Sequence, residues 1–474
     1  YATYTSGTGT NALVFTLSPT IGDVDLDGVT VSSPIDLNGG TIKDTSGNDA
    51  TLTFTPPNTS GIKVNYPSLG MDFTNGTAGR YTLNGTVYND ISSFLTASGG
   101  SFTRSSIGTY FDSTGILQTA PINTPRFDYD PVTHQPKGIL IEESRTNLLK
   151  SSDNLLSYWS PNLSATVTYD DVIAPDGTMT ADTISATASG AGKYQSIPIT
   201  SGTTYTNSLF LKFVSGSSSS IRFGSDSNAT TIKINPQTMN IISNSANVIT
   251  SNINSVGGGW YRLAWSWSTP NTVTSFILYN DTASPIAFAV WGMQTEQGSF
   301  PTSYIPTTTT AITRAADTLT IPTASWITQG RGVLFSRAIS PPLSSSKFPG
   351  AVAIDDGTIN NALQHFIWDG QDDKTGNVIF LSGNTIYDQR GATMLSGGIF
   401  TQATAYAPHN APDNMNASVN GTLLVPNMTT TVPTFNTMRV GARRGGGDPL
   451  NACIQQIRYY PLRISDAQLQ ILTQ

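Results

Sequence analysis

The chain has 474 residues, of which only 12% are charged, against about 25% in typical soluble domains. Apolar residues make up 38%, and the net charge is only −7, which is typical of folded domains and not of a disordered chain. With 24 lysines and arginines and no strong basic cluster, the chain lacks the footprint of a nucleic-acid-binding protein. No run of 18 apolar residues occurs, so we expect no membrane insertion. At about 150 residues a domain, the length predicts roughly three domains.

The first 62 residues alternate in the manner of β-strands, with Leu13, Phe15 and Leu17 on one face and a turn at Asn38-Gly39. The stretch that follows Leu13 resembles the last strands of Ig-like repeats in bacterial surface adhesins. We therefore expect a full or partial Ig-like domain over residues 1–62. Because the chain begins YATYTSG, with neither a methionine nor a signal sequence, we expect a fragment or a processed product.

An acidic stretch in this region places Asp23, Asp25 and Asp27 directly before Gly28. Carboxylates at alternate positions can converge on one hard cation, so calcium is a candidate cofactor. The EF-hand pattern would continue with a glutamate at its twelfth position, where this chain has Pro34. The other interpretation is an acidic hairpin loop that binds no metal.

Residues 63–147 are less regular, and Gly-containing turn signals separate short apolar runs. This pattern predicts an extended connector with short strands, which packs on the next domain or on a neighbouring subunit.

Rare charges gather at the end of this connector. The chain has only three glutamates, and Glu142 and Glu143 follow an apolar strand directly, with Arg145 two residues further on. Glu296 lies in a second stretch that looks like the partner of the first. Opposite charges packed this tightly at a strand end predict a structural junction, in which Arg145 pairs with one of the three glutamates.

Three motifs in order carry a resemblance: RFDYDPVTHQPKGILIEESRTNLL (126–149), APDGTMTADTI (174–184) and WGMQTEQGSFPTSYIPTTTTAITRAAD (291–317). They resemble bacteriophage tail-fibre, tailspike and other virion-surface proteins. The resemblance implies a carbohydrate-binding-module-like sandwich over residues 148–317 and a virion-surface, extracellular location. It also implies other virion proteins as partners and a homo-oligomer, with a trimer favoured by analogy with phage fibres.

The strongest strand signals of this middle domain surround Trp260, Trp265 and Trp267. Tyr261, Leu263 and Trp265 share one face of the strand because side chains alternate. Aromatic side chains on an exposed sheet would hold sugars by stacking on their C–H faces. The alternative is that these tryptophans form the core of the sandwich.

Residues 318–474 read as a further sandwich of short strands. Cys453–Tyr460 and the residues after it resemble the end of concanavalin-A-like and laminin-G-like sandwiches, where a short helix follows the last strand. Ser465 and Gln468 have the spacing of a helix capping box, which supports that helix. Cys453 is the single cysteine, so an intrachain disulfide is excluded and a buried apolar role is expected.

The sequence gives no positive signal for catalysis, and we expect no enzyme. The last domain has no glutamate, so the Glu-x-Asp-x-x-Glu strand of concanavalin-A-like glucanases is absent. No sequence motif pairs the aspartates of this domain. They could lie in solvated loops, bind calcium or, least of all, form the carboxylate pair of a glycosidase. The candidates are Asp355, Asp356, Asp369, Asp372 and Asp373. The three histidines (His134, His365 and His409) match no metal or triad spacing.

One candidate glycan site stands out in the last domain. Trp368 ends an apolar run directly before Asp369 and a glycine, which places it at a sheet rim, and Arg443 and Arg444 lie in a Gly-rich loop. These four residues predict a site for acidic sugars. The alternative is that Trp368 fills the core and the arginines pair with Asp372 and Asp373.

The sequence therefore predicts an all-β, multidomain protein: an Ig-like part, a connector, and two jelly-roll or concanavalin-A-like sandwiches at 148–317 and 318–474. The function that fits best is a non-enzymatic phage virion-surface or tail-fibre component that adheres to host-surface glycans. A structural fibre or decoration subunit, whose sandwiches make subunit contacts, is the second interpretation. A glycan-degrading tailspike is the third.

Overall fold

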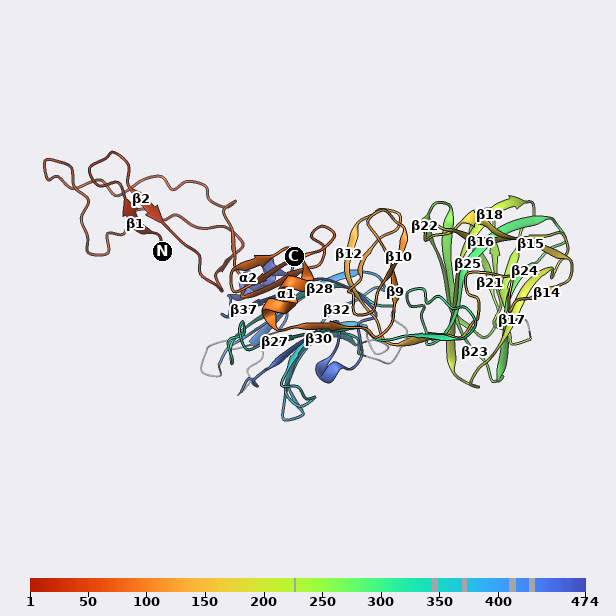
Figure 1. Cartoon of the computed structure of the whole chain (residues 1–474). Helices are drawn as coiled ribbons and strands as arrows, with labels where there is room; N and C mark the ends of the chain where they lie inside the picture. The colour runs from red at the N-terminus through yellow and green to blue at the C-terminus, as the bar shows by residue number, and fades with distance from the viewer. Residues whose placement is uncertain (226, 343–347, 369–372, 409–414, 426–430) are drawn as a thin grey trace.

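The computed structural model describes residues 1–474 except 226, 343–347, 369–372, 409–414 and 426–430. The side chains of residues 386 and 392 are not described either. The described chain is almost entirely β-structure, so the predicted fold class is confirmed. Three parts follow one another in space: an N-terminal arm, a sandwich that holds the C-terminus, and a second sandwich at the far end (Figure 1).

The middle sandwich consists of two six-stranded antiparallel sheets. One sheet has the order β14 (Ser160–Asn162), β17 (Gly192–Pro198), β24 (Val273–Asn280), β19 (Ile221–Gly224), β20 (Ile232–Asn235) and β21 (Asn240–Asn244). The other has the order β15 (Ala165–Ile173), β16 (Met179–Ala186), β25 (Ile286–Gln297), β18 (Thr204–Gly216), β23 (Trp260–Ser268) and β22 (Val248–Gly257). Side chains alternate between the two faces of each strand, and the apolar ones are buried between these two sheets.

The C-terminal sandwich packs a ten-stranded sheet on a seven-stranded one. The main path of the larger sheet is β35 (Thr422–Leu423), β34 (Met415–Val419), β33 (Ile399–Tyr406), β28 (Gly332–Ile339), β37 (Ala452–Tyr460), β5 (Leu69–Asp72), β6 (Arg80–Leu83) and β7 (Thr86–Tyr88), with β12 (Pro136–Ile141) and β11 (Phe127–Tyr129) beside β37. The smaller sheet has the order β32 (Asn384–Thr393), β31 (Lys374–Leu381), β30 (Ala362–Trp368), β29 (Gly350–Asp355), β36 (Thr437–Val440), β27 (Thr318–Pro322) and β8 (Ser101–Thr103).

Residues 63–147 are more than the extended connector that the sequence predicts. Strand β5 pairs with β37, with Met71 opposite Ile457, and β8 pairs with β27. The strands on both sides of the middle sandwich therefore complete one C-terminal sandwich, and the middle sandwich is an insertion into it. Sequence alone missed this arrangement because partners almost four hundred residues apart share no local pattern.

Two helices cover the C-terminal sandwich. Helix α1 (Ile91–Ser98) begins at Asp90, whose side chain accepts a hydrogen bond from the Ser93 amide, and ends at Gly99 in the left-handed region. Helix α2 (Asp466–Leu472) begins at Ser465, which accepts from the Gln468 amide at 3.3 Å. The predicted cap of the C-terminal helix is thus confirmed.

The N-terminal arm has only short strands: β1 (Thr3–Ser6), β2 (Val14–Thr16), β3 (Val24–Asp25) and β4 (Val64–Asn65), in two-stranded sheets. Its base packs on the C-terminal sandwich, where the Leu26 amide donates to the Gln468 side chain at 2.8 Å. Its tip projects away from the body (Figure 1) and leaves Tyr4 and Phe15 exposed. No strand forms between β3 and β4, over residues 26–63, although the alternation of the first 62 residues predicts strands there.

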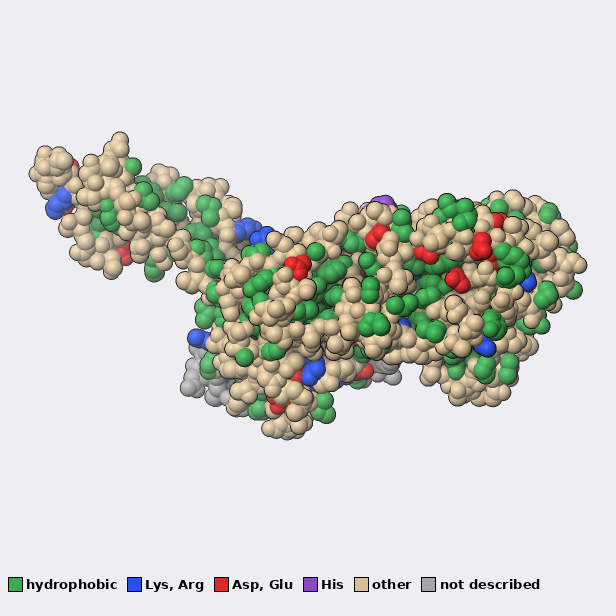
Figure 2. Space-filling model, viewed as in Figure 1, with side chains coloured by type: hydrophobic (Ala, Val, Ile, Leu, Met, Phe, Trp, Pro, Cys, Tyr) green, Lys and Arg blue, Asp and Glu red, His purple; other side chains and the backbone are tan. Residues whose placement is uncertain are grey.

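The insertion is joined to its host by a two-stranded ribbon, β13 (Arg145–Asn147) with β26 (Ile312–Arg314), and by the hairpin of β9 (Gly108–Phe111) and β10 (Leu117–Ala120). Leu117 packs with Trp260 and Trp291 of the middle sandwich. Apolar contacts and backbone pairing therefore fix the two sandwiches together. Charged side chains are sparse on the visible surface of the whole molecule (Figure 2).

Candidate functional site

The outer face of the seven-stranded sheet carries the predicted Trp368. On β30, His365 points into the sandwich, where its Nδ1 lies 2.9 Å from Ser336 Oγ of the facing sheet. Burial holds the pKa of His365 at about 3, so this histidine is neutral. Because side chains alternate along a strand, Gln364, Phe366 and Trp368 lie on the opposite, outer face.

Trp368 is half-buried, and aromatic and guanidinium groups surround it. Its ring lies 5.0 Å from Phe348 and 5.3 Å from Phe366, and the Arg390 guanidinium lies 4.0 Å from its centroid. Gly376 on β31 makes room for this packing, since a Cβ there would lie 2.7 Å from both the Phe366 ring and the Trp368 Nε1. Trp368 is the last residue of β30 and is not fully buried.

Two further arginines cover the same face. The Arg443 guanidinium lies 5.0 Å from the Phe348 centroid and 5.5 Å from that of Phe366. The Arg444 guanidinium lies 3.2 Å from the centroid of Phe380. We call this set of Phe348, Phe366, Trp368, Phe380, Arg390, Arg443 and Arg444, together with Gln364, the arginine–aromatic cluster.

A buried ion pair holds the Gly-rich segment over the sheet. Asp355 on β29 accepts from Arg439 Nε at 2.6 Å and from the Gly445 amide at 3.0 Å. The Arg444 amide also donates to Gln364 Oε1 at 3.4 Å. Gly445 has φ +66°, a conformation that favours glycine, so the Gly-rich sequence is needed for this turn.

The cluster has an excess of hydrogen-bond donors. Arg443 pairs with Asp448 at 2.7 Å, whereas Arg444 has no carboxylate partner within the described chain. Four buried N–H groups lack acceptors among the described residues: Gln364 Nε2, Trp368 Nε1, Arg443 Nε and Arg444 Nη1. Burial and the charge of Arg443 lower the pKa of Arg444 to about 10, which leaves it protonated at neutral pH. These four N–H groups are themselves inaccessible to solvent, so the groups that a ligand can reach are the partly exposed parts of Trp368, Arg443 and Arg444.

The structure thus brings together three of the four residues predicted for the glycan site: Trp368, Arg443 and Arg444. Asp369 and Asp372 lie outside the described residues. Arg443 pairs with Asp448 and not with Asp373, which differs from the predicted alternative.

The predicted junction residues lie at the joint between the sandwiches, but not as one group. Arg145 Nε donates to Glu143 Oε1 at 2.7 Å, and its Nη1 donates to the Gln297 carbonyl. Glu296 is bonded instead within the middle sandwich, where it accepts from the Thr302 amide at 3.0 Å. Of the three glutamates, the one that Arg145 contacts is therefore Glu143.

Glu142 belongs to a second, fully buried ion cluster at the joint. Arg126 donates to Glu142 at 2.8 Å and to Asp317 at 2.5 Å, and Arg104 donates to Asp317 at 3.0 Å. Arg314 lies 3.5 Å from Glu142. Burial acts to raise the pKa of Glu142, but the guanidinium groups of Arg314 and Arg126 hold it well below its usual range. We call these five residues the buried ion cluster.

The sequence analysis identified none of the three arginines in this cluster. Arg126 and Arg314, with Asp317, stand inside the quoted motifs, so a search for charges among buried strands would have found them. Arg104 stands in a polar run and gives no such signal.

The three acidic residues proposed for calcium act as turn and contact residues. Asp23 accepts from the Thr20 amide at 2.6 Å and Asp25 from the Gly28 amide at 2.9 Å, while Asp27 accepts from the Gln468 side chain. No group of three potential metal ligands occurs among the residues that the structure describes, and a calcium site at these carboxylates stays a prediction.

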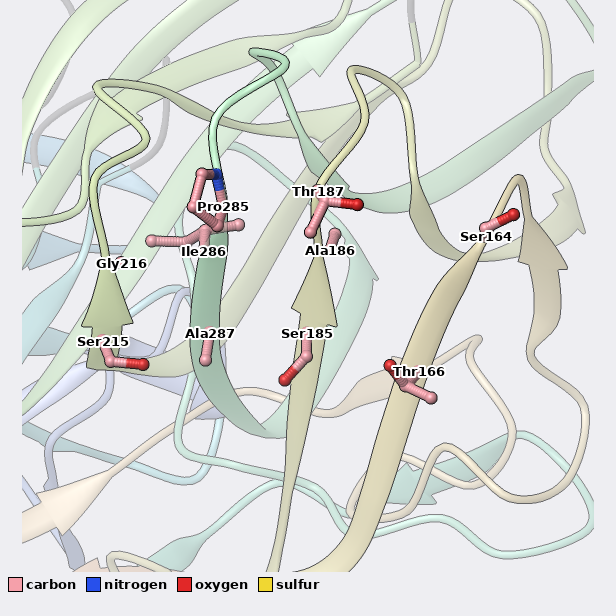
Figure 3. Close-up of a pocket in the computed structure, with 10 residues that line it drawn as sticks. All are labelled: Ser164, Thr166, Ser185, Ala186, Thr187, Ser215, Gly216, Pro285, Ile286 and Ala287. Atoms are coloured by element: carbon pink, nitrogen blue, oxygen red, sulfur yellow. The ribbon is translucent and has the colours of Figure 1, made fainter.

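The tryptophans of the middle sandwich are core residues. Trp260, Trp265 and Trp267 are each at most 3% exposed, as the core interpretation required, so none offers a face to a sugar. The surface of this sandwich has a hollow of about 270 Å³, which lies at the ends of strands β15, β16, β18 and β25 (Figure 3). There Ser185 lies opposite Thr166 and Ala287 on adjacent strands, and no aromatic residue lines the hollow.

No family model and no curated protein matches the chain. Among solved structures, the CBM40 of the Ruminococcus gnavus IT-sialidase bound to alpha2,3 sialyllactose is similar, with a TM-score of 0.26, 15% identity, and coverage of 31% of this chain and 84% of that one. Domains LG4-5 of the mouse laminin alpha1 chain are similar with a TM-score of 0.21, 10% identity, and coverage of 58% and 87%. These similarities are distant, and the fold rests on the strand pairing described above.

The chain is thus an all-β protein in which one sandwich is inserted into another. No helix in the described part of the chain is long and apolar enough to cross a membrane.

Proposed function

We propose that this protein is a virion-surface or tail-fibre component that adheres to acidic glycans of a host surface through the arginine–aromatic cluster. The observation that carries the proposal is the pair of partly exposed guanidinium groups of Arg443 and Arg444, which lie on aromatic rings beside the partly exposed Trp368. A uronic or other acidic sugar supplies carboxylate and hydroxyl oxygens to such donors. The half-buried rings beside them offer apolar surface to the C–H groups of the sugar.

The virion-surface part of the proposal rests on the three motifs that resemble phage tail proteins. The low charge and the many Thr, Ser and Asn side chains suit an extracellular adhesin. The proposed role is non-enzymatic, which is supported by the lack of a Glu-x-Asp-x-x-Glu strand in the sequence of the last domain and by the pairing of Asp355 with Arg439.

Binding of an acidic polysaccharide tests the proposal. Arg444→Ala removes one charge-assisted donor, worth about 1.5–3 kcal/mol, and should weaken binding of a uronic-acid polysaccharide about 10–100-fold. Arg80→Ala, an exposed arginine on β6 of the other sheet, is the matched control and should bind like the parent protein. Equal affinities of the two variants in surface plasmon resonance would remove the cluster from glycan binding.

A structural role in assembly is a second candidate, and the N-terminal arm favours it. Residues 1–22 carry no charged side chain, and their tip exposes Tyr4, Val14 and Phe15. Contact between copies of the arm brings these residues near other residues of the same segment, and an uncharged apolar segment meets no charge repulsion there. A homo-oligomer built through the arm agrees with the trimer that the fibre resemblance implies.

A further inference from the structure

A groove of about 990 Å³ lies beside the joint between the two sandwiches. Three segments form it: residues 143–148 around β13, the turn at 198–205 between β17 and β18, and residues 297–299 at the end of β25. We call it the junction groove. It is separate from the arginine–aromatic cluster, which is built from β30, β31 and the Gly-rich segment.

The walls of the junction groove are held in place from several sides. Arg145, in one wall, is fixed by Glu143 at 2.7 Å and lies 4.9 Å over the Phe300 ring. The Glu143 amide donates to Asn451 of the C-terminal sandwich at 2.8 Å. In another segment of the lining, the Tyr205 hydroxyl accepts from the Thr200 amide at 2.9 Å. The groove is therefore largely pre-formed, as ligand sites usually are.

The lining is rich in hydroxyl groups and has no net charge. Seven of its fourteen lining residues carry a hydroxyl, among them Ser144, Thr200 and Thr203. Leu148 and Ile199 supply apolar surface between them. Its single cation, Arg145, is paired with the single anion, Glu143.

We propose that the junction groove binds a neutral oligosaccharide. Sugar rings present C–H groups on their faces and hydroxyls around their edges, which matches apolar side chains interspersed with hydroxyls. A phosphate or a strongly acidic polymer is disfavoured because the only guanidinium is already neutralised by a carboxylate. The volume lies at the upper end of that of small-molecule sites, about 300–1,000 Å³, so a chain of several sugar rings fits.

This site stands apart from the proposed function, since it differs from the arginine–aromatic cluster in both position and charge. A glycan with neutral and acidic units carries the chemistry of both sites, so each site would contribute to the adhesion of such a glycan. Neutral glycans should bind through the groove even when the cluster is disabled.

The test is an array of immobilised neutral glucans, mannans and galactans, probed with the full chain. Thr203→Tyr and Ser144→Tyr each add a ring to a residue that lines the groove, in two of its three segments. Thr238→Tyr makes the same kind of change at an exposed threonine outside the groove and serves as the matched control. Thermal unfolding checks that each variant is folded.

We expect the parent chain, Thr238→Tyr and Arg444→Ala to bind at least one neutral glycan, and either groove variant to lose at least 10-fold in affinity. Both groove variants should keep binding of an acidic polysaccharide. Absence of any neutral glycan binding by the parent chain overturns the proposal, as does binding by folded groove variants that equals that of Thr238→Tyr. Loss of acidic binding in Arg444→Ala bears only on the proposed function, so the two ideas fail separately.

Discussion

Removal of one carboxylate from the buried ion cluster tests what fixes the two sandwiches together. Asp317→Asn keeps the shape of the side chain but removes its charge, and it leaves Arg104 without a carboxylate partner. The wild-type cluster holds three arginines and two carboxylates, a net charge of +1, and the variant raises this to +3 − 1 = +2 in the same buried volume.

The expected cost follows from the burial of these groups. The side chains of Arg104, Arg126 and Asp317 are 0% exposed. Loss of one partner of such a buried pair costs about 3–5 kcal/mol, which corresponds to a fall in Tm of about 6–20 °C for a domain of this size. Differential scanning calorimetry of the full chain measures this shift.

Two further variants define the outcome. Asp466→Asn removes the carboxylate of a partly exposed pair with Arg463 and should cost only about 0–1 kcal/mol. Arg104→Met combined with Asp317→Asn returns the cluster to a net charge of +1, so it should recover part of the loss. A fall in Tm for Asp317→Asn no larger than for Asp466→Asn, or a double variant as unstable as the sum of its single changes, refutes the reasoning.

Three other predictions concern pH, catalysis and assembly. Burial, reinforced by Asp170 and Asp171, raises the pKa of Asp182 to about 6, so the contribution of Asp182 to stability should fall as pH rises from about 4 to 6. Relative to the parent protein, Asp182→Asn should therefore gain stability between pH 4 and 7.5 in a Tm series, and an equal change of Tm in both proteins contradicts this. Purified protein should release no reducing ends from host capsule or O-antigen, and release above a boiled control contradicts this. Phe15→Asp should shift the mass in light scattering toward the monomer, while Asp49→Asn on the same arm should not, and an unchanged mass in both variants argues against assembly through the arm.

Local patterns predicted much of the fold. The alternating run that holds Trp260, Trp265 and Trp267 became β23 (Trp260–Ser268), as its period of two predicts. The periodicity of such a run carries the signal. Helix α1 was missed although Asp90 and Gly99 were readable as its caps.

The nesting of the sandwiches could not be read from the sequence. Strand pairing such as Met71 with Ile457 depends on the closure of a sheet by distant segments, which leaves no trace in either segment alone. For the same reason, only part of the candidate site could be predicted from the sequence. The Gly-rich basic loop around Arg443 and Arg444 stood out in composition, whereas Phe348 and Phe380 join the site only through the folded sheet.

The paired strands that lead into and out of the inserted sandwich have a mechanical consequence. A pull on that sandwich by a bound surface passes along β13 and β26 side by side, and then into β12 and β27. Both of these strands are hydrogen-bonded along their length to neighbours in the host sandwich. Tension along β12 and β27 therefore acts on all of these hydrogen bonds at the same time, in shear. The bonds are not broken one after another, as they are when a strand is peeled from the edge of a sheet. The joint is thus built so that traction on one domain is shared between the two sheets of the other.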